Sequence, residues 1–186
     1  ECRELFTAPK GKVLVGADAS GIELRVLAHY LAQWDKGAYA KTIVEGDIHT
    51  ANQEAAGLST RDESKKFIYM WLYGAGNKAL GEIVDGGERE GKALKEQFLR
   101  KIPAVRKLMT AVESKVNTSG TMQGLDGRIL PARKAFSALN LLCQSAAAVI
   151  MKQALIEFTK GASFLHGGRL LYEMHANVHD EVQFSC

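Results

Sequence analysis

The chain has 186 residues, of which 46% are hydrophobic and 24% charged, and its formal net charge is +3. This is the composition of an ordinary globular protein of one or two domains, and it excludes a low-complexity chain. The mild positive charge permits a polyanionic partner without requiring one. Three cysteines, Cys2, Cys143 and Cys186, are odd in number and form no Cys-x-x-Cys pair, which argues against a disulfide framework or a zinc site.

We find no apolar run near the roughly 20 residues of a membrane-spanning helix, and no signal peptide, so we expect no membrane partner. The chain begins at Glu1 rather than at a methionine, and Cys186 ends it inside an alternating, strand-like stretch. We therefore expect the sequence to be a fragment of a larger protein.

The first part of the chain predicts one strand followed by helices. Residues 12–17 are apolar and indicate a buried strand. Thr60 and Glu63 have the spacing of a capping box, which marks a helix start, and Gly74 interrupts that helix. Helices are expected at residues 22–32, 49–56 and 61–73.

The second part predicts further helices and two hairpins. Residues 77–116 are helical in pattern, with a break near Gly86 and a restart at Pro103. Asp126 and Gly127 form a hairpin signal. A long helix is expected at residues 135–160, and two alternating strands at residues 169–178 and 182–185, with a bend at residues 179–181.

Asp18 follows the first predicted strand directly. An acid at the carboxyl end of a strand faces outward from the sheet edge, where its oxygens suit a hard divalent cation. The alternative is that Asp18 only caps the helix that follows. This segment alone leaves both interpretations open.

Four residues of the helix that starts at Arg61 recur at intervals of four: Arg61, Lys65, Tyr69 and Tyr73. Each interval drifts by only about 40° on a helix with 3.6 residues per turn, so all four share one face. The cations suit phosphate oxygens, and the rings suit a sugar and a base. The alternative is a solvated basic patch that runs into a core aromatic stripe.

His179, Asp180 and Glu181 lie at the bend between two apolar strands. A rigid bend is a suitable place for a metal ligand, although adjacent acids in a turn are often only solvated. His179 suits zinc poorly, because no other histidine or cysteine lies at zinc-ligand spacing.

Asn140 and Gln144 lie one turn apart in the long apolar helix. Paired amides can contact the acceptor atoms that base pairs present in the minor groove, or they can be buried and satisfied by the backbone. The basic residues Arg128, Arg133 and Lys134 lie just upstream and suit phosphate contacts.

The order of these motifs resembles the polymerase domain of family A DNA polymerases, in particular the short-tailed-phage branch. The resemblance rests on DASGIELR (18–25), R-x3-K-x3-Y-x3-YG (61–74) and HDE (179–181), which are similar to motifs A, B and C of that family. It implies an α+β fold, with a palm built on a small antiparallel sheet and a mostly helical fingers subdomain. The implied subdomains are residues 1–48 (palm, first part), 49–118 (fingers) and 119–186 (palm, second part).

The resemblance also implies a role for each matching residue. Asp18 and Asp180 would bind two Mg²⁺ ions together with the Ala19 carbonyl, and Glu181 would support that catalytic site. The implied nucleotide-binding residues are Glu23, which would exclude a ribose 2′-hydroxyl, His49, Arg61 and Lys65 at the triphosphate, Tyr69 at the sugar, and Tyr73 at the templating position. The implied DNA-binding residues are Arg128, Asn140, Gln144 and His179.

The expected function is therefore template-directed DNA synthesis from dNTPs on a primer–template. The resemblance further implies replication in the host cytoplasm and a possible processivity factor that binds through a thumb absent from this sequence. Phe136 departs from the family pattern, in which many members have a basic residue. We expect the isolated chain to be weakly active or inactive.

Three other functions remain as alternatives. A single-subunit RNA polymerase has a similar fold, but Glu23, Tyr69 and Glu181 favour DNA. A nucleic-acid-binding module would bind DNA without catalysis. A helical scaffold would not explain the two acids at strand ends.

Overall fold

The computed structural model describes residues 7–132, 134–161, 165–166, 169–170 and 172–186. The chain divides into two compact units. We call Glu1–Ile22 with Ala146–Cys186 the sheet unit, and Glu23–Ser145 the helical unit. The expected α+β class is confirmed, whereas the subdomain boundaries expected after residues 48 and 118 stay predictions. Arg133, a predicted phosphate contact, lies outside the described residues.

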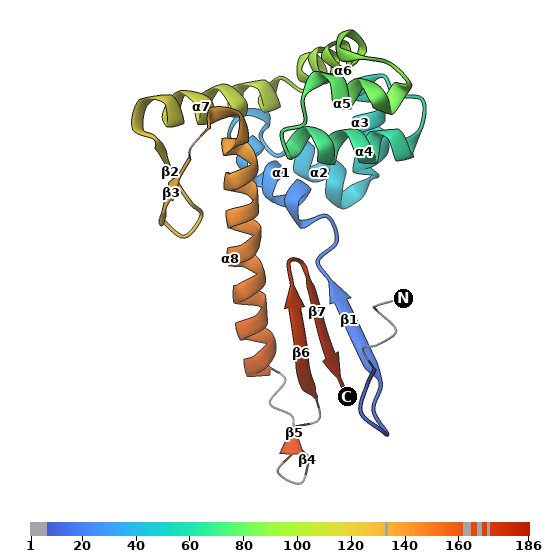
Figure 1. Cartoon of the computed structure of the whole chain (residues 1–186). Coiled ribbons are helices and arrows are strands. Elements are labelled where there is room, and N and C mark those ends of the chain that lie inside the picture. Colours follow the sequence, from blue (N-terminus) through green and yellow to red (C-terminus); the bar gives the residue numbers. More distant parts are fainter. Residues whose placement is uncertain (1–6, 133, 162–164, 167–168, 171) are drawn as a thin grey trace. The chain divides into compact units, whose positions relative to one another are not determined.

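The sheet unit contains a three-stranded antiparallel sheet in the order β1-β7-β6 (Figure 1). Its strands are β1 (Leu14–Asp18), β6 (Glu173–Val178) and β7 (Glu181–Ser185). The strands β4 (Leu165–His166) and β5 (Arg169–Leu170) form a separate pair. Strand β1 begins two residues later than expected and includes Asp18. It is largely exposed, which corrects the expectation of a buried strand, because β1 lies at the edge of the sheet.

An aromatic cluster packs inside the sheet unit. The ring of Phe158 lies 5.1 Å from that of Tyr172 and 5.4 Å from that of Phe184, which belongs to β7. The fully buried hydroxyl of Ser185 lies 2.8 Å from Nε2 of His175. The contact between His175 and Ser185 links β6 to β7, and the ring contacts hold Phe158 of α8 (Ala138–Gly161) against Tyr172 and Phe184. Together these contacts support the hairpin that carries Asp180.

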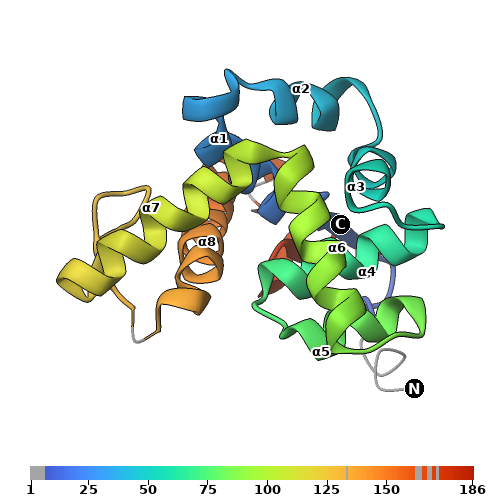
Figure 2. The ribbon, with the colours of Figure 1, turned by 90° about the horizontal axis from the view of Figure 1, so that it is seen from above.

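The helical unit consists mainly of α-helices (Figure 2). Helices α3 and α4 lie side by side, and α5 packs closely on α6. The elements are α1 (Ile22–Asp35), α2 (Ala38–Glu45), α3 (Ile48–Ala56), α4 (Arg61–Leu72), α5 (Asn77–Gly81), the 3₁₀ turn η2 (Glu82–Val84), α6 (Glu88–Lys101), α7 (Pro103–Ser119), the hairpin β2 (Thr121–Gln123) and β3 (Ile129–Pro131), and the 3₁₀ turn η3 (Ala135–Ser137).

The core of the helical unit is aromatic and aliphatic. Phe98 of α6 contacts Phe67 and Trp71 of α4 edge-to-face, at centroid distances of 5.4 and 5.3 Å. Phe67 and Phe98 are completely buried. Edge-to-face aromatic pairs add about 0.5–1.5 kcal/mol beyond the area that they bury. This cluster holds α4 against α6 and leaves the opposite face of α4 exposed.

Most local predictions agree with the structure. Thr60 and Glu63 form the expected capping box at the start of α4, and Pro103 begins α7. Helix α2 was missed, because its eight residues begin after Gly37 without a side-chain cap. The expected break near Gly86 and Gly87 is confirmed, because α6 begins only after Gly87, and the α-helix before the break is short, because α5 ends at Gly81.

Helix α8 (Ala138–Gly161) changes one expectation about membranes. Together with η3 it forms, within the described part of the chain, one helix whose length and apolar composition would allow it to cross a membrane. The expectation that no such run exists was therefore wrong. The core helix of a soluble protein passes the same test, and α8 buries Leu139, Cys143, Ala147 and Met151 at intervals of four, the pattern of a helix that packs one face.

Candidate functional site

Strand pairing brings the two acidic motifs of the sheet unit together. In the antiparallel register of β1 and β7, Asp18 lies opposite Glu181. The backbone N–H of Ala19 donates a 2.9 Å hydrogen bond to the carbonyl oxygen of Asp180. The segments Asp18–Ala19 and Asp180–Glu181 are thus neighbours at one end of the sheet, although they lie near opposite ends of the chain.

The bend before Glu181 is tight. His179 is exposed and has φ of 56°, in the left-handed region that non-glycine residues rarely adopt. The hairpin closes with Val178 opposite Glu181. A Cβ atom at Gly16 would lie 3.2 Å from a carboxylate oxygen of Glu181, so the glycine leaves room for that side chain.

The donor atoms at this end of the sheet suit a hard cation. Asp18, Asp180 and the Ala19 carbonyl are oxygen donors, and Asp18 is exposed. Among the described residues, no three His, Cys, Asp or Glu side chains gather closely enough to bind a metal by themselves. Mg²⁺ in proteins usually keeps several waters and binds through one or two carboxylates together with substrate phosphates.

Helix α4 presents the four predicted residues on its exposed side. The opposite side buries Ser64, Phe67, Ile68, Trp71 and Leu72. The rings of Tyr69 and Tyr73 stack, with centroids 6.4 Å apart and planes at 26°. The alternative, that these tyrosines belong to a core stripe, does not hold, because Tyr73 is 47% exposed and Tyr69 lies outside the buried set.

The first turns of α3 and α4 meet and form a basic cluster. The Ser64 hydroxyl donates a 2.7 Å hydrogen bond to the carbonyl oxygen of His49. The His49 ring lies 6.2 Å from the Tyr69 ring, and the charges of Arg61 and Lys65 act on it. Two helix N-termini and the charges of Arg61 and Lys65 favour an anion here, while the carboxylates of Asp47 and Asp62 offset part of that charge.

The pKa and the hydrogen bonding of His49 both suit the binding of an anion. Burial lowers the pKa of His49, and the nearby charge of Arg61 lowers it further. Its Nδ1 is buried and has no hydrogen-bond partner among the described residues. The ring is therefore mainly neutral at pH 7, and its pKa will rise when a negative ligand binds.

Asp47 contacts the basic cluster, and its sequence position did not single it out. It caps α3, and it accepts hydrogen bonds from Arg61 Nε at 2.5 Å and Arg61 Nη2 at 3.3 Å. Hydrogen bonding to Arg61 holds the pKa of the Asp47 carboxyl well below its usual range. An aspartate before a predicted helix signals a cap, but the pattern does not indicate which cation it contacts.

Glu23 and Tyr73 are joined within the helical unit. The Tyr73 hydroxyl donates a short hydrogen bond to Oε1 of Glu23. Gly74, with φ of 83°, follows Tyr73 directly and turns the chain at the end of α4. The charge of Glu23 also acts on Cys143 of α8. Burial raises the pKa of the Cys143 thiol, and the charge of Glu23 raises it further, to about 12.

Three of the predicted DNA-binding residues, Arg128, Asn140 and Gln144, belong to the helical unit, whereas His179 belongs to the sheet unit. Arg128 lies in the β2–β3 hairpin, and its Nε donates a 2.6 Å hydrogen bond to Oδ2 of Asp126. The sequence analysis overlooked this acidic partner. In α8, Gln144 is exposed and Asn140 has a buried Oδ1 without a partner among the described residues. An unpaired buried amide oxygen is costly in a folded chain, and such an atom can serve a ligand.

Phe136, which replaces the basic residue of the family pattern, is 65% exposed. Its ring lies beside Gly74, where a Cβ atom would be 3.7 Å away. The ammonium of Lys134 lies 5.6 Å from the ring centroid. A cation therefore remains near this position although the residue itself is apolar.

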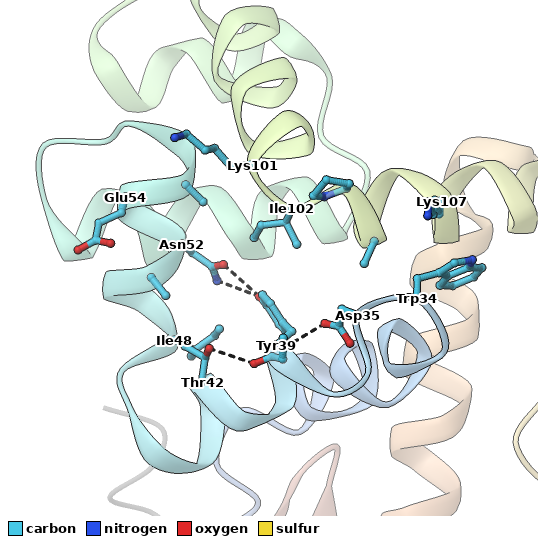
Figure 3. Close-up of a pocket in the computed structure, with 15 residues that line it drawn as sticks. Trp34, Asp35, Tyr39, Thr42, Ile48, Asn52, Glu54, Lys101, Ile102 and Lys107 are labelled. Atoms are coloured by element: carbon cyan, nitrogen blue, oxygen red, sulfur yellow. Dashed lines mark hydrogen bonds between the residues drawn. The ribbon is translucent and has the colours of Figure 1, made fainter.

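A pocket of about 580 Å³ is lined by residues of α2, α3 and the junction of α6 and α7 (Figure 3). Ile48 and Asn52 line it, whereas His49 is turned by about 100° from Ile48 around the helix. The Tyr39 hydroxyl donates to Asn52 Oδ1 at 3.1 Å and accepts from Nδ2 at 3.0 Å. The residues predicted for catalysis, nucleotide binding or DNA binding do not line this pocket.

Comparison with known proteins gives a consistent result. The model of DNA polymerase family A matches residues 1–186. The chain is 43% identical over 211 residues to the DNA-directed DNA polymerases of Enterobacteria phage T3 and Escherichia phage T7. Each of these matches covers 100% of this chain but only 30% of the relative's length.

A solved structure is also similar. The POL domain of Pol1 from M. smegmatis, in complex with DNA primer-template and dNTP, superposes with a TM-score of 0.81 at 25% identity, over 98% of this chain and 35% of that one. The family match, the phage relatives and the shared fold agree with the arrangement of the three motifs. The chain belongs to DNA polymerase family A.

Proposed function

We propose that this chain forms the nucleotide- and metal-binding core of a template-directed DNA polymerase. The reaction transfers a nucleotide from a dNTP to a primer 3′-hydroxyl and releases pyrophosphate. The observation that carries the proposal is the pairing of β1 with β7, which makes Asp18 and Asp180 neighbours at one sheet end. Family membership and the similarity to phage DNA-directed DNA polymerases support it.

The metal site is assigned to Asp18, Asp180 and the carbonyl of Ala19. Family A DNA polymerases are in general metal-dependent, and the two-ion arrangement with Mg²⁺ is our proposal. Bound Mg²⁺ supplies charge stabilisation for the attacking and leaving oxygens. Glu181, opposite Asp18 in the register, keeps further negative charge at the sheet end and so favours cation binding.

The triphosphate is assigned to His49, Arg61 and Lys65. Arg61 offers N–H donors that match phosphate oxygens, Lys65 adds a mobile charge, and His49 offers an unpaired Nδ1. The three side chains neutralise the charge that develops on the leaving pyrophosphate. The N-termini of α3 and α4 add to the same positive potential.

The sugar and base are assigned to Glu23, Tyr69 and Tyr73. We propose that the carboxyl of Glu23 occupies the space of a ribose 2′-hydroxyl and thereby excludes ribonucleotides. Its hydrogen bond from Tyr73 supports this role, because it fixes the position of the carboxylate. We assign Tyr69, whose ring stacks on that of Tyr73, to the sugar, and the stacking supports this assignment because it holds the Tyr69 ring in place.

Primer–template DNA is the proposed partner, with Arg128, Asn140, Gln144 and His179 as its contacts. The solved relative is described in complex with DNA primer-template and dNTP, which supports both ligands. Because the two phage relatives are viral enzymes, we propose replication in the host cytoplasm. A processivity factor stays a prediction, since the chain spans 30% of these relatives.

The test is single-nucleotide incorporation on a primer–template, with the chain in excess so that weak activity is detectable. We expect incorporation of dNTPs in preference to rNTPs, and loss of incorporation in Asp18→Asn. An equal rate with dNTPs and rNTPs would refute the assignment to DNA. Incorporation at the unchanged rate in Asp18→Asn would refute the metal site. Stable DNA binding without incorporation, also when the chain is joined to the remaining segments of a phage relative's polymerase, would favour a binding module.

A further inference from the structure

Asp47 contacts one edge of the Arg61 guanidinium and leaves the other edge available. Arg61 donates from Nε to Oδ2 at 2.5 Å and from Nη2 to Oδ1 at 3.3 Å. A guanidinium carries five N–H donors, so this side-on pair uses two of them. The remaining donors point from the terminal edge, the geometry that binds two phosphate oxygens at once.

The Asp47 carboxylate is itself held in place by α3. Its Oδ1 accepts a 3.0 Å hydrogen bond from the backbone N–H of His49, and its Oδ2 accepts one of 3.0 Å from the Thr50 hydroxyl. Helix α3 is tied to α4 through the hydrogen bond from Ser64 to the His49 carbonyl. Asp47 is therefore a fixed acceptor for Arg61, which lies in the first turn of α4.

We propose that Asp47 is a positioning residue, which orients the Arg61 guanidinium so that its terminal edge meets the incoming triphosphate. This role rests on the proposed function of Arg61. The side chain of Arg61 is 52% exposed, so a ligand can reach it while Asp47 stays in place. A long arginine side chain loses conformational freedom when it binds a ligand, and a preformed pair reduces that loss.

The same carboxylate repels a triphosphate, so a change of affinity in Asp47→Asn alone is ambiguous. A double-mutant cycle removes the ambiguity. The direct repulsion between Asp47 and the ligand is the same whether position 61 is arginine or lysine, and it cancels. Asparagine is as good a helix cap as aspartate, so the start of α3 is preserved.

The experiment measures binding of inorganic tripolyphosphate by calorimetry to the wild-type chain, Asp47→Asn, Arg61→Lys and the double variant. We expect Arg61→Lys to weaken binding about fivefold or more in the wild-type background and less than about twofold in the Asp47→Asn background. The reason is that the guanidinium of arginine can contact Asp47 with one edge and phosphate with the other, whereas the ammonium of lysine is a point charge without two such edges. Without the Asp47 carboxylate, arginine loses this advantage over lysine. Asp62→Asn is the matched control. Asp62 acts on Arg61 through its charge and not through a hydrogen bond, so Arg61→Lys should cost as much in the Asp62→Asn background as in the wild type.

A ¹⁵N–¹H spectrum of the Arg61 Nε–H group separates positioning from a merely structural role. We expect a distinct, slowly exchanging signal in the wild type that is lost in Asp47→Asn at an unchanged unfolding temperature. An equal cost of Arg61→Lys in both backgrounds, or an Nε–H signal that is unaffected by Asp47→Asn, would overturn the inference. If Arg61→Ala leaves tripolyphosphate binding unchanged, or if the wild type binds none, the proposed triphosphate site fails instead.

Discussion

The backbone N–H of Ala19 donates a 2.9 Å hydrogen bond to the carbonyl oxygen of Asp180. This bond lies just beyond the last residue pair of the β1–β7 ladder, Asp18 with Glu181. The ladder therefore delivers both aspartates to one end of the sheet, and it sets the spacing of the oxygen donors there. Changes to either aspartate should affect metal binding without unfolding the sheet.

Asp18→Asn and Asp180→Asn are each expected to abolish Mn²⁺ binding in an electron paramagnetic resonance titration. Each should also reduce single-nucleotide incorporation at least about 100-fold, because preorganised charge stabilisation of this kind contributes that much to catalysis. Asp126→Asn, an exposed change in the β2–β3 hairpin, is the control and should leave Mn²⁺ binding unchanged. Normal Mn²⁺ affinity in both aspartate variants would remove the basis for the metal site.

Glu23→Ala should relax the discrimination between dNTPs and rNTPs. The carboxyl that Tyr73 holds would be gone, and space for a 2′-hydroxyl would open. We expect the ratio of kcat/KM for dNTP to kcat/KM for rNTP to fall by at least about tenfold, in line with the loss of a steric and polar barrier. Tyr73→Phe, which keeps the ring but not the hydroxyl, should give a smaller fall. An unchanged ratio in Glu23→Ala would exclude this role.

Triphosphate binding should strengthen as the pH falls, through His49. Its pKa in the free chain lies below the ordinary value of 6.5, and a bound anion raises it, so binding takes up a proton. Affinity therefore rises as the pH drops through the bound-state pKa, and it levels off below the free-state pKa. The measurement is the Kd for tripolyphosphate from pH 8 to pH 5 in wild type and His49→Gln. The ligand titrates equally in both, so the difference reports His49, and parallel curves would contradict the prediction.

Tyr69→Phe should increase discrimination against dideoxynucleotides. We expect the Tyr69 hydroxyl to occupy the place of the 3′-hydroxyl that a dideoxynucleotide lacks. Loss of one such hydrogen bond should raise the preference for dNTP over ddNTP about five- to tenfold. Competitive incorporation of dTTP and ddTTP measures it. Tyr30→Phe serves as a control at a tyrosine outside the α4 face, and discrimination that is identical in Tyr69→Phe and wild type would be evidence against this role.

Gly91→Ala should destabilise the helical unit. A Cβ atom at Gly91 would lie 1.8 Å from the carbonyl oxygen of Asn77 and 2.6 Å from the backbone nitrogen of Gly81. Helices α5 and α6 would have to separate, at a cost of about 1–3 kcal/mol or more. Chemical denaturation measures the free energy of unfolding. Gly76→Ala is the control, because its Cβ atom would meet open space, and equal stabilities of the two variants would show that α5 and α6 do not pack this closely.

The sequence by itself determined the local elements and the family. The capping box of Thr60 and Glu63, the restart of a helix at Pro103 and the common face of Arg61 and Lys65 depend on residues a few positions apart. Such patterns act through backbone hydrogen bonds and helix periodicity, which the neighbouring residues decide. For this reason they could be predicted without any knowledge of the rest of the chain.

Only the tertiary structure decided which distant groups meet. The hydrogen bond between Tyr73 and Glu23, the ion pair between Arg61 and Asp47, and the exposure of β1 at the sheet edge were not predictable from local patterns. Each depends on how separate elements pack, and a helix cap or a strand pattern is compatible with many partners. Sequence motifs thus identified the acids and cations, whereas packing decided which side chain holds each of them.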